Sequence, residues 1–165
     1  MIRPRPARPE HNGLATSGGP RDTRAVEATG HIAEIQRFAV GHAAGVSALA
    51  QAEGWPTFSD QARVVRLLAA PGTVGEVAVD GEGKVVGAAH LLTDGHHAYL
   101  TFLAVAAHAR RGGIGRRLID AAFADSGAER IDLLATEESA DFYRRLRHFE
   151  FVGFRVYPKA ADQPT

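Results

Sequence analysis

One glycine-rich stretch of this chain reads Arg110-Arg111-Gly112-Gly113-Ile114-Gly115-Arg116. The apolar run before it, Tyr99–Val105, has the composition of a β-strand. Beyond it, Ile114, Leu118 and Ala122 recur every four residues, which predicts a helix with one buried face. A turn from a strand into a helix leaves backbone N–H groups unpaired, and the helix dipole favours negative charge at that end. The stretch therefore predicts a phosphate-binding turn.

The spacing of the glycines excludes two common phosphate loops. A Walker A loop has lysine directly after its last glycine, whereas Arg116 follows Gly115 here. A dinucleotide-binding fingerprint has a third glycine, and Leu118 stands in its place. The pattern Arg/Gln-x-x-Gly-x-Gly/Ala is met by Arg110, Gly113 and Gly115. A structural turn with surface arginines stays the alternative as long as the glycines are considered alone.

Three further landmarks accompany this pattern, and with them the sequence resembles the GNAT superfamily, the GCN5-related N-acetyltransferases. Glu34–Phe38 resembles the first strand of that family, and Leu103–Val105 resembles the end of its fourth strand. Ala140–Tyr143 resembles its "A-x-F-Y" helix. The resemblance spans about Ile32–Pro158 and implies the GNAT fold and an N-acetyltransferase activity.

The resemblance also implies how acetyl-CoA, the co-substrate, is held. The backbone of Leu103, Ala104 and Val105 is expected to bond to the pantetheine arm as an added strand would. The side chains expected to add charge at the pyrophosphate are those of Arg110 and Arg116. The N–H groups expected to hold the pyrophosphate belong to Arg111, Gly112, Gly113, Ile114, Gly115 and Arg116.

Direct attack of an amine on a thioester needs a neutral amine and a proton for the leaving thiolate, with no metal and no covalent enzyme intermediate. By the resemblance Tyr143 supplies that proton, because a phenol is a donor at neutral pH. A half-buried core tyrosine is the alternative. The base stays undefined, since Tyr99–Phe102 carries no carboxylate. The candidates on nearby strands and turns are Glu76, His90, His96 and His97, each of which also fits an ordinary surface or turn residue.

The composition limits the classes of function. A chain of 165 residues suffices for one domain, and a net charge of zero argues against general binding of nucleic acid or membrane surfaces. The chain has no cysteine, which excludes disulfides, thiolate nucleophiles and cysteine-ligated zinc. No metal site is expected, since the adjacent His96 and His97 would face opposite sides of a strand. We expect a cytoplasmic protein with an amine acceptor and without membrane or nucleic-acid partners; a homodimer is left open.

Three segments are expected along the chain. Residues 1–30 predict a disordered extension, residues 31–158 the acetyltransferase domain, and residues 159–165 a short tail. The domain is expected to be α/β, with a mixed, mostly antiparallel sheet, a splayed parallel strand pair and about four flanking helices. The predicted strands are 34–38, 75–79, 84–92, 99–105, 130–134 and 149–156, and the predicted helices are 43–52, 59–69, one from 114 and 139–147.

Two regions leave the acceptor side open. Arg147 and His148 stand where the family commonly has Gly-Phe, so the turn into the last predicted strand differs. In the segment between the first two helices, Trp55 and Phe58 either pack against an acceptor or hold the segment to the core. A CoA-binding module without catalysis is therefore a second hypothesis. A third, a DNA-associated protein using five arginines of the first thirty residues, is weakened by the zero net charge.

Overall fold

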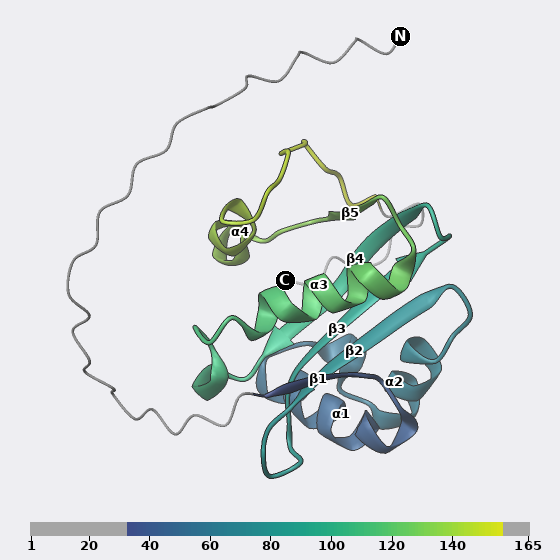
Figure 1. The fold of residues 1–165 in the computed structure, drawn as a ribbon, viewed down its shortest axis with the longest axis vertical. Helices are drawn as coiled ribbons and strands as arrows, with labels where there is room; N and C mark the ends of the chain where they lie inside the picture. Colours follow the sequence, from purple (N-terminus) through teal and green to yellow (C-terminus); the bar gives the residue numbers. More distant parts are fainter. Residues whose placement is uncertain (1–32, 157–165) are drawn as a thin grey trace, which may run out of the picture. The chain divides into compact units, whose positions relative to one another are not determined.

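The computed structural model describes residues 33–156, which contain a five-stranded sheet with helices on both faces (Figure 1). The first four strands are antiparallel to their neighbours, and the fifth runs parallel to the fourth. This confirms the mixed sheet with a parallel pair. The expected extension 1–30 and tail 159–165 lie outside the described residues. In spatial order the strands are β1 (Glu34–Arg37), β2 (Thr73–Val79), β3 (Val85–Thr93), β4 (His97–Val105) and β5 (Arg130–Leu133).

The helices divide the core into two layers. Side chains of the first two helices pack with one face of the sheet, around Val77 and Phe102. The third helix lies on the opposite face of the sheet (Figure 1). Its side chains pack there around Ala78 and Leu100. The helices are α1 (Ala43–Ala52), α2 (Gln61–Leu68), α3 (Ile114–Ser126) and α4 (Glu137–Arg144), with short 3₁₀ helices η1 (Val40–His42), η2 (Pro56–Phe58) and η3 (Ala107–Ala109).

Short polar side chains begin and end these elements. The Asp60 carboxylate accepts the N–H of Arg63 at 2.7 Å and caps α2. The Asp80 carboxylate accepts the N–H groups of Glu82 and Lys84 at 3.0 and 2.9 Å, which closes the predicted β2–β3 hairpin. His42 precedes α1 and makes no side-chain hydrogen bond that caps it.

A bulge in β4 changes which of its side chains meet each core. Phe102 lies opposite His90, but Leu100 lies opposite the next residue, Leu91, so Thr101 is left without a partner on β3. Residues two apart on a regular strand share a face. Because of the bulge, Leu100 packs with α3 while Phe102 packs with α1 and α2.

The predicted last strand, 149–156, is wrong. The described residues contain no strand after β5, and the apolar side chains of this segment lie in solvent, with Phe149 78% and Val152 85% exposed. The alternation of apolar residues matched a strand, but a strand also needs a neighbouring backbone to bond with. Among the described residues the segment has none. The preceding helix, α4, also ends earlier than predicted, at Arg144.

Candidate functional site

The parallel strands β4 and β5 separate part-way along the sheet. Their last paired residues are Leu100 and Leu133, whereas β4 continues to Val105. Residues Thr101–Val105 therefore have β3 on one side and no strand on the other within the described part of the chain. The structure thus contains the predicted opening beside the end of β4.

The backbone of β4 offers alternate residues to this opening. The N–H of Ala106 donates to the Val86 carbonyl on β3 at 2.9 Å. In an antiparallel strand, successive residues direct their N–H and C=O groups to opposite sides. Leu103 and Val105 therefore direct theirs toward the opening, while Ala104 directs its own toward β3. Of the three residues expected to bond to the pantetheine arm, two have backbone groups on the open side.

The glycine-rich loop turns sharply between η3 and α3. Arg111 has a φ of 67°, and among the described residues it is the one non-glycine residue with a positive φ. Gly113, the residue before α3, has a φ of 76°. L-residues with side chains rarely adopt this conformation, and such positions concentrate at ligand sites. The glycine at 113 meets this demand without strain, whereas Arg111 carries some.

This turn leaves a row of backbone donors free. The hydrogen-bond ladder of α3 starts with the N–H of Arg117, which donates to the Gly113 carbonyl at 3.1 Å. Within residues 33–156, the six N–H groups of Arg111–Arg116 have no acceptor. The first turn of α3 carries no acidic side chain. The donors and the helix dipole together favour an anion at this position.

The two arginines expected at the pyrophosphate differ in their surroundings. Arg110 donates from Nε to the Val105 carbonyl at 3.0 Å, and its terminal nitrogen contacts the Glu53 carboxylate. Arg116 projects into solvent, and its Nε lies 3.7 Å from the Asp120 carboxylate one turn later in α3. The Arg110 side chain is thus directed to the protein, while that of Arg116 lies on the surface.

Gly115 allows α4 to approach the start of α3. A Cβ at Gly115 would lie 3.3 Å from Cζ of Phe142 and 3.7 Å from Cγ2 of Val105. The ring of Phe142 therefore covers the first turn of α3, as expected for the inward-facing residue of that helix. Phe142 also meets the ring of Tyr143 edge-on, with 5.0 Å between ring centroids.

Tyr143 is half-buried against the α3 core. Burial raises the pKa of its phenol above the ordinary value of 10.0, which keeps the hydroxyl protonated at neutral pH. The residue is therefore a hydrogen donor, as the general-acid role requires. The same position also fits the alternative of a core tyrosine.

Two of the four candidate bases are engaged elsewhere. His90 is buried, with Nδ1 2.5 Å from the Thr101 hydroxyl and Nε2 3.1 Å from the Leu67 carbonyl. Because a carbonyl only accepts, Nε2 carries the proton, and burial lowers the pKa of this ring so that it stays neutral. Glu76 lies on β2, two strands from β4, beside Asp125 and Arg37.

The other two candidates are neighbours in space. The rings of His96 and His97 lie 4.4 Å apart between centroids, so the expectation that they face opposite sides is wrong. The reason is local: β4 begins at His97, which leaves His96 in the turn. His96 lies 3.5 Å from the Glu129 carboxylate. No group of three possible metal ligands occurs within residues 33–156.

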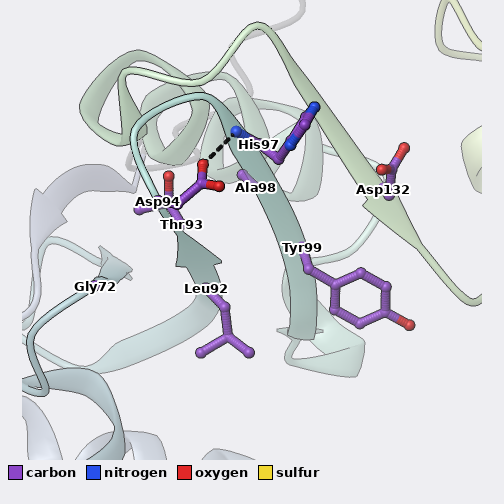
Figure 2. Close-up of a pocket in the computed structure, with 8 residues that line it drawn as sticks. All are labelled: Gly72, Leu92, Thr93, Asp94, His97, Ala98, Tyr99 and Asp132. Carbon is purple, nitrogen blue, oxygen red and sulfur yellow. Dashed lines mark hydrogen bonds between the residues drawn. The ribbon is translucent and has the colours of Figure 1, made fainter.

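An open cavity of about 280 Å³ lies at the paired end of β3, β4 and β5 (Figure 2). Leu92, Tyr99 and Asp132 form one row across these strands, one register step before the last β4–β5 pair. Leu92 is 47% and Tyr99 37% exposed. No sequence pattern pointed to this cavity, because strand alternation alone does not mark a polar side chain as lining one. Its lining residues are Gly72, Leu92, Thr93, Asp94, His97, Ala98, Tyr99 and Asp132.

Asp94 holds the turn at the rim of this cavity. Its carboxylate accepts the N–H groups of His96 and His97 at 2.8 and 2.7 Å, the latter drawn in Figure 2. These hydrogen bonds lower the pKa of Asp94, so the group is an anion at neutral pH.

The two aromatic residues of the segment between α1 and α2 differ in their burial. Phe58 is buried and stacks on Phe102, with 4.2 Å between ring centroids, so it belongs to the core. Trp55 meets Phe102 edge-on at 5.1 Å but remains 37% exposed. Phe58 therefore holds the segment, and Trp55 presents part of its indole to solvent. In the described residues no helix combines the length and apolar character that crossing a membrane requires.

The comparisons with known proteins concern this same region. Residues 73–146 match the family model for the acetyltransferase (GNAT) domain. That range covers both strands of the opening, the glycine-rich loop and α3, and it reaches past the end of α4. No curated protein matches the chain.

Solved structures share the fold. One is a Trypanosoma brucei acetyltransferase, with 20% identity, a TM-score of 0.60, and coverage of 75% of this chain and 98% of that one. A second is AAC(6')-Iy in complex with the bisubstrate analogue CoA-S-monomethyl-acetylneamine, with 20% identity, a TM-score of 0.63, and coverage of 78% and 98%. A third is an aminoglycoside acetyltransferase from an uncultured soil metagenomic sample in complex with sisomicin, with 24% identity, a TM-score of 0.62, and coverage of 78% and 97%. With the family match over the site, they lead to one conclusion: residues 73–146 are similar to the GNAT acetyltransferase domain, and the chain shares the fold of these acetyltransferases.

Proposed function

We propose that this enzyme transfers the acetyl group of acetyl-CoA to a primary amine by direct attack in a ternary complex. The amine nitrogen bonds to the thioester carbonyl carbon, the carbon–sulfur bond breaks, and the nitrogen loses a proton to a base. The CoA thiolate takes up a proton and leaves. The observation that carries the proposal is the row of six N–H groups at Arg111–Arg116 that have no acceptor within residues 33–156, beside the opening between β4 and β5.

The donor half of the site follows from this arrangement. The free N–H groups bind the pyrophosphate, with the solvent-facing Arg116 adding charge. The pantetheine arm lies along β4 and bonds to the open-side backbone groups of Leu103 and Val105. Ala104 lies between Leu103 and Val105 on β4 and so belongs to the strand that borders the opening.

Tyr143 protonates the leaving thiolate in this proposal. Its helix lies against the start of α3 through the contact of Phe142 with Gly115, and Tyr143 packs on the same core cluster as Leu103 and Val105, which supports a phenol on the donor side of the opening. The hydroxyl is protonated at neutral pH, so no change of ionisation precedes the transfer.

The acceptor half is the cavity beside Tyr99. It lies one register step from the point where β4 and β5 separate, and it combines an aromatic face with the carboxylates of Asp94 and Asp132. Such a lining attracts a cationic amine. One solved relative of the fold is in complex with sisomicin, which makes aminoglycosides a sensible part of an acceptor panel. Among the four candidate bases, His97 lines this cavity and is the one we assign.

A thermal-shift titration with acetyl-CoA, paired with a thioester-loss assay over a panel of amines, tests the proposal. We expect acetyl-CoA to raise the unfolding temperature and at least one amine of the panel to be acetylated. Stabilisation by acetyl-CoA without turnover on any amine would favour a CoA-binding module instead. No stabilisation by acetyl-CoA would contradict the proposed donor site.

A further inference from the structure

A charged side chain from outside the glycine-rich loop is built into its base. Glu53 directly follows α1 and starts the segment that carries Trp55. Its side chain is only 13% exposed, although a carboxylate normally lies in water. A carboxylate withdrawn this far from solvent needs hydrogen-bond donors.

The donors come from the segment that joins β4 to α3. One Glu53 oxygen, Oε1, accepts the N–H of Ala107 at 3.2 Å, and the other, Oε2, contacts the terminal nitrogen of Arg110. Arg110 in turn donates from Nε to the Val105 carbonyl at 3.0 Å. The Glu53 carboxylate therefore connects the end of α1 to both ends of η3. Arg110, which contacts that carboxylate, also bonds to Val105, the last residue of β4.

These contacts occupy Arg110 on two sides. To meet an anion at the free N–H groups, its guanidinium would have to leave Glu53 or the Val105 carbonyl. Leaving Glu53 would strand a carboxylate that is largely withdrawn from water, which costs free energy. The side chain is therefore better suited to fix the base of the loop than to meet the pyrophosphate.

We propose that Glu53 is a positioning residue for acetyl-CoA, acting through Arg110, and that it links the segment after α1 to the donor loop. The inference rests on the proposed function, since it assumes that the free N–H groups of Arg111–Arg116 bind the pyrophosphate. Loss of the Glu53 contact allows the segment 105–110 to move. The six N–H groups that follow it are then no longer held in one position for the pyrophosphate. Trp55, the single tryptophan of the chain, lies two residues from Glu53 and reports on the link.

The test compares Glu53→Gln, Arg110→Gln and the double variant with the wild type, by calorimetric titration with acetyl-CoA. Glu53→Gln keeps the shape of the side chain and removes its charge. We expect each single variant to raise the Kd of acetyl-CoA about tenfold, the size of a lost charge-assisted hydrogen bond. The double variant should lose little more than either single one, because the two residues act as one unit. We also expect acetyl-CoA to change Trp55 emission in the wild type and less so in Glu53→Gln.

A matched control is Glu129→Gln, which neutralises an exposed carboxylate that pairs with His96. It should leave the Kd unchanged, and unfolding temperatures of all variants separate loss of binding from loss of fold. If Glu53→Gln does not fold, Arg110→Lys takes its place, because it keeps a charge near Glu53 but cannot also reach the Val105 carbonyl.

Three results have distinct meanings. If the wild type does not bind acetyl-CoA, the proposed function fails. If the wild type binds it and Glu53→Gln binds as tightly, the positioning role fails while the proposed function stands. If Arg110→Gln alone weakens binding, Arg110 meets the pyrophosphate directly and the positioning role is again overturned.

Discussion

Tyr143 carries the proposed chemistry at the scale of a single residue. Replacing it with phenylalanine removes the hydroxyl and keeps the half-buried ring against the α3 core. We expect Tyr143→Phe to bind acetyl-CoA as the wild type does and to lower turnover at least tenfold, because general-acid catalysis is typically worth about 10²–10⁴-fold in rate. Steady-state rates with an amine found by the panel, together with calorimetric Kd values, measure both quantities. Unchanged turnover would remove Tyr143 from the mechanism and leave it a core residue.

Glu76 makes a separate prediction about pH. Its side chain is buried, Oε1 has no hydrogen-bond partner in the described part of the chain, and the charged groups that face it are Asp125 and Arg37. Burial first, and then the neighbouring Asp125 carboxylate, raise the pKa of Glu76 from 4.5 to about 7, although Arg37 opposes the shift. The folded state therefore holds this proton more tightly than the unfolded chain does.

The sign of the effect follows from that difference. The proton on Glu76 contributes its full share to the free energy of unfolding below about pH 4.5. This contribution is lost as the pH rises to about 7 and does not change further above that pH. The total is at most about 3 kcal/mol of unfolding free energy. We expect denaturant unfolding of Glu76→Gln to lack this decline, whereas the exposed control Glu82→Gln retains it. A wild type and Glu76→Gln with parallel pH profiles would show that Glu76 titrates normally.

The residue-scale contacts also mark a limit of sequence reading. Spacing and composition identified the loop residues Arg110, Gly113 and Gly115, because their pattern is local in the chain. The contact of Glu53 with Arg110 joins residues that lie 57 positions apart, so no local sequence pattern predicts it. The rings of His96 and His97 lie close together because β4 begins at His97 and leaves His96 in the turn, and the predicted strand, which began at Tyr99, did not show this.

At the scale of elements, the approach of α4 to α3 depends on the missing side chain at Gly115. Valine there would place atoms against the Phe142 ring and Val105, which must then shift. We expect Gly115→Val to lower the unfolding free energy by about 1–3 kcal/mol, as overpacking usually does, and to weaken acetyl-CoA binding. Chemical denaturation and calorimetric titration measure the two effects.

The matched control is Gly41→Val, because a Cβ at Gly41 meets nothing within 4 Å. A second control places Gly115→Val in a Phe142→Leu background, where the ring atoms that valine would meet are gone. The loss of unfolding free energy caused by Gly115→Val should then be smaller. Equal costs for Gly115→Val in both backgrounds would show that the α3–α4 contact does not depend on this glycine.

Local signals predicted most elements well. The apolar period placed α1 at the residues it occupies, Asp60 capped α2, and turn residues closed the β2–β3 hairpin. The bulge at Thr101 could not be read from the sequence, because it depends on which core each neighbouring side chain enters. The strand predicted over 149–156 had the right alternation but no partner among the described residues, since pairing is a property of the sheet and not of the segment.

At the scale of the whole domain, the two core layers hold the two segments that Glu53 and Arg110 connect. The Glu53–Phe58 segment packs with the α1–α2 layer. The glycine-rich loop leads into the α3 layer, against which the Tyr143 side chain packs. The opening between β4 and β5 lies where these layers meet. The central claim is that the backbone N–H groups of Arg111–Arg116 bind the pyrophosphate of acetyl-CoA there.

Amide resonances of the isotopically labelled protein, followed during titration with acetyl-CoA, test this claim most directly. At 17.6 kDa the chain suits such spectra. We predict that the amide signals of Arg111–Arg116 move furthest, together with those of Leu103 and Val105, while those of Ser126 and Gly127, at the opposite end of α3, stay in place. Saturation with acetyl-CoA that leaves the Arg111–Arg116 signals unchanged would contradict the account.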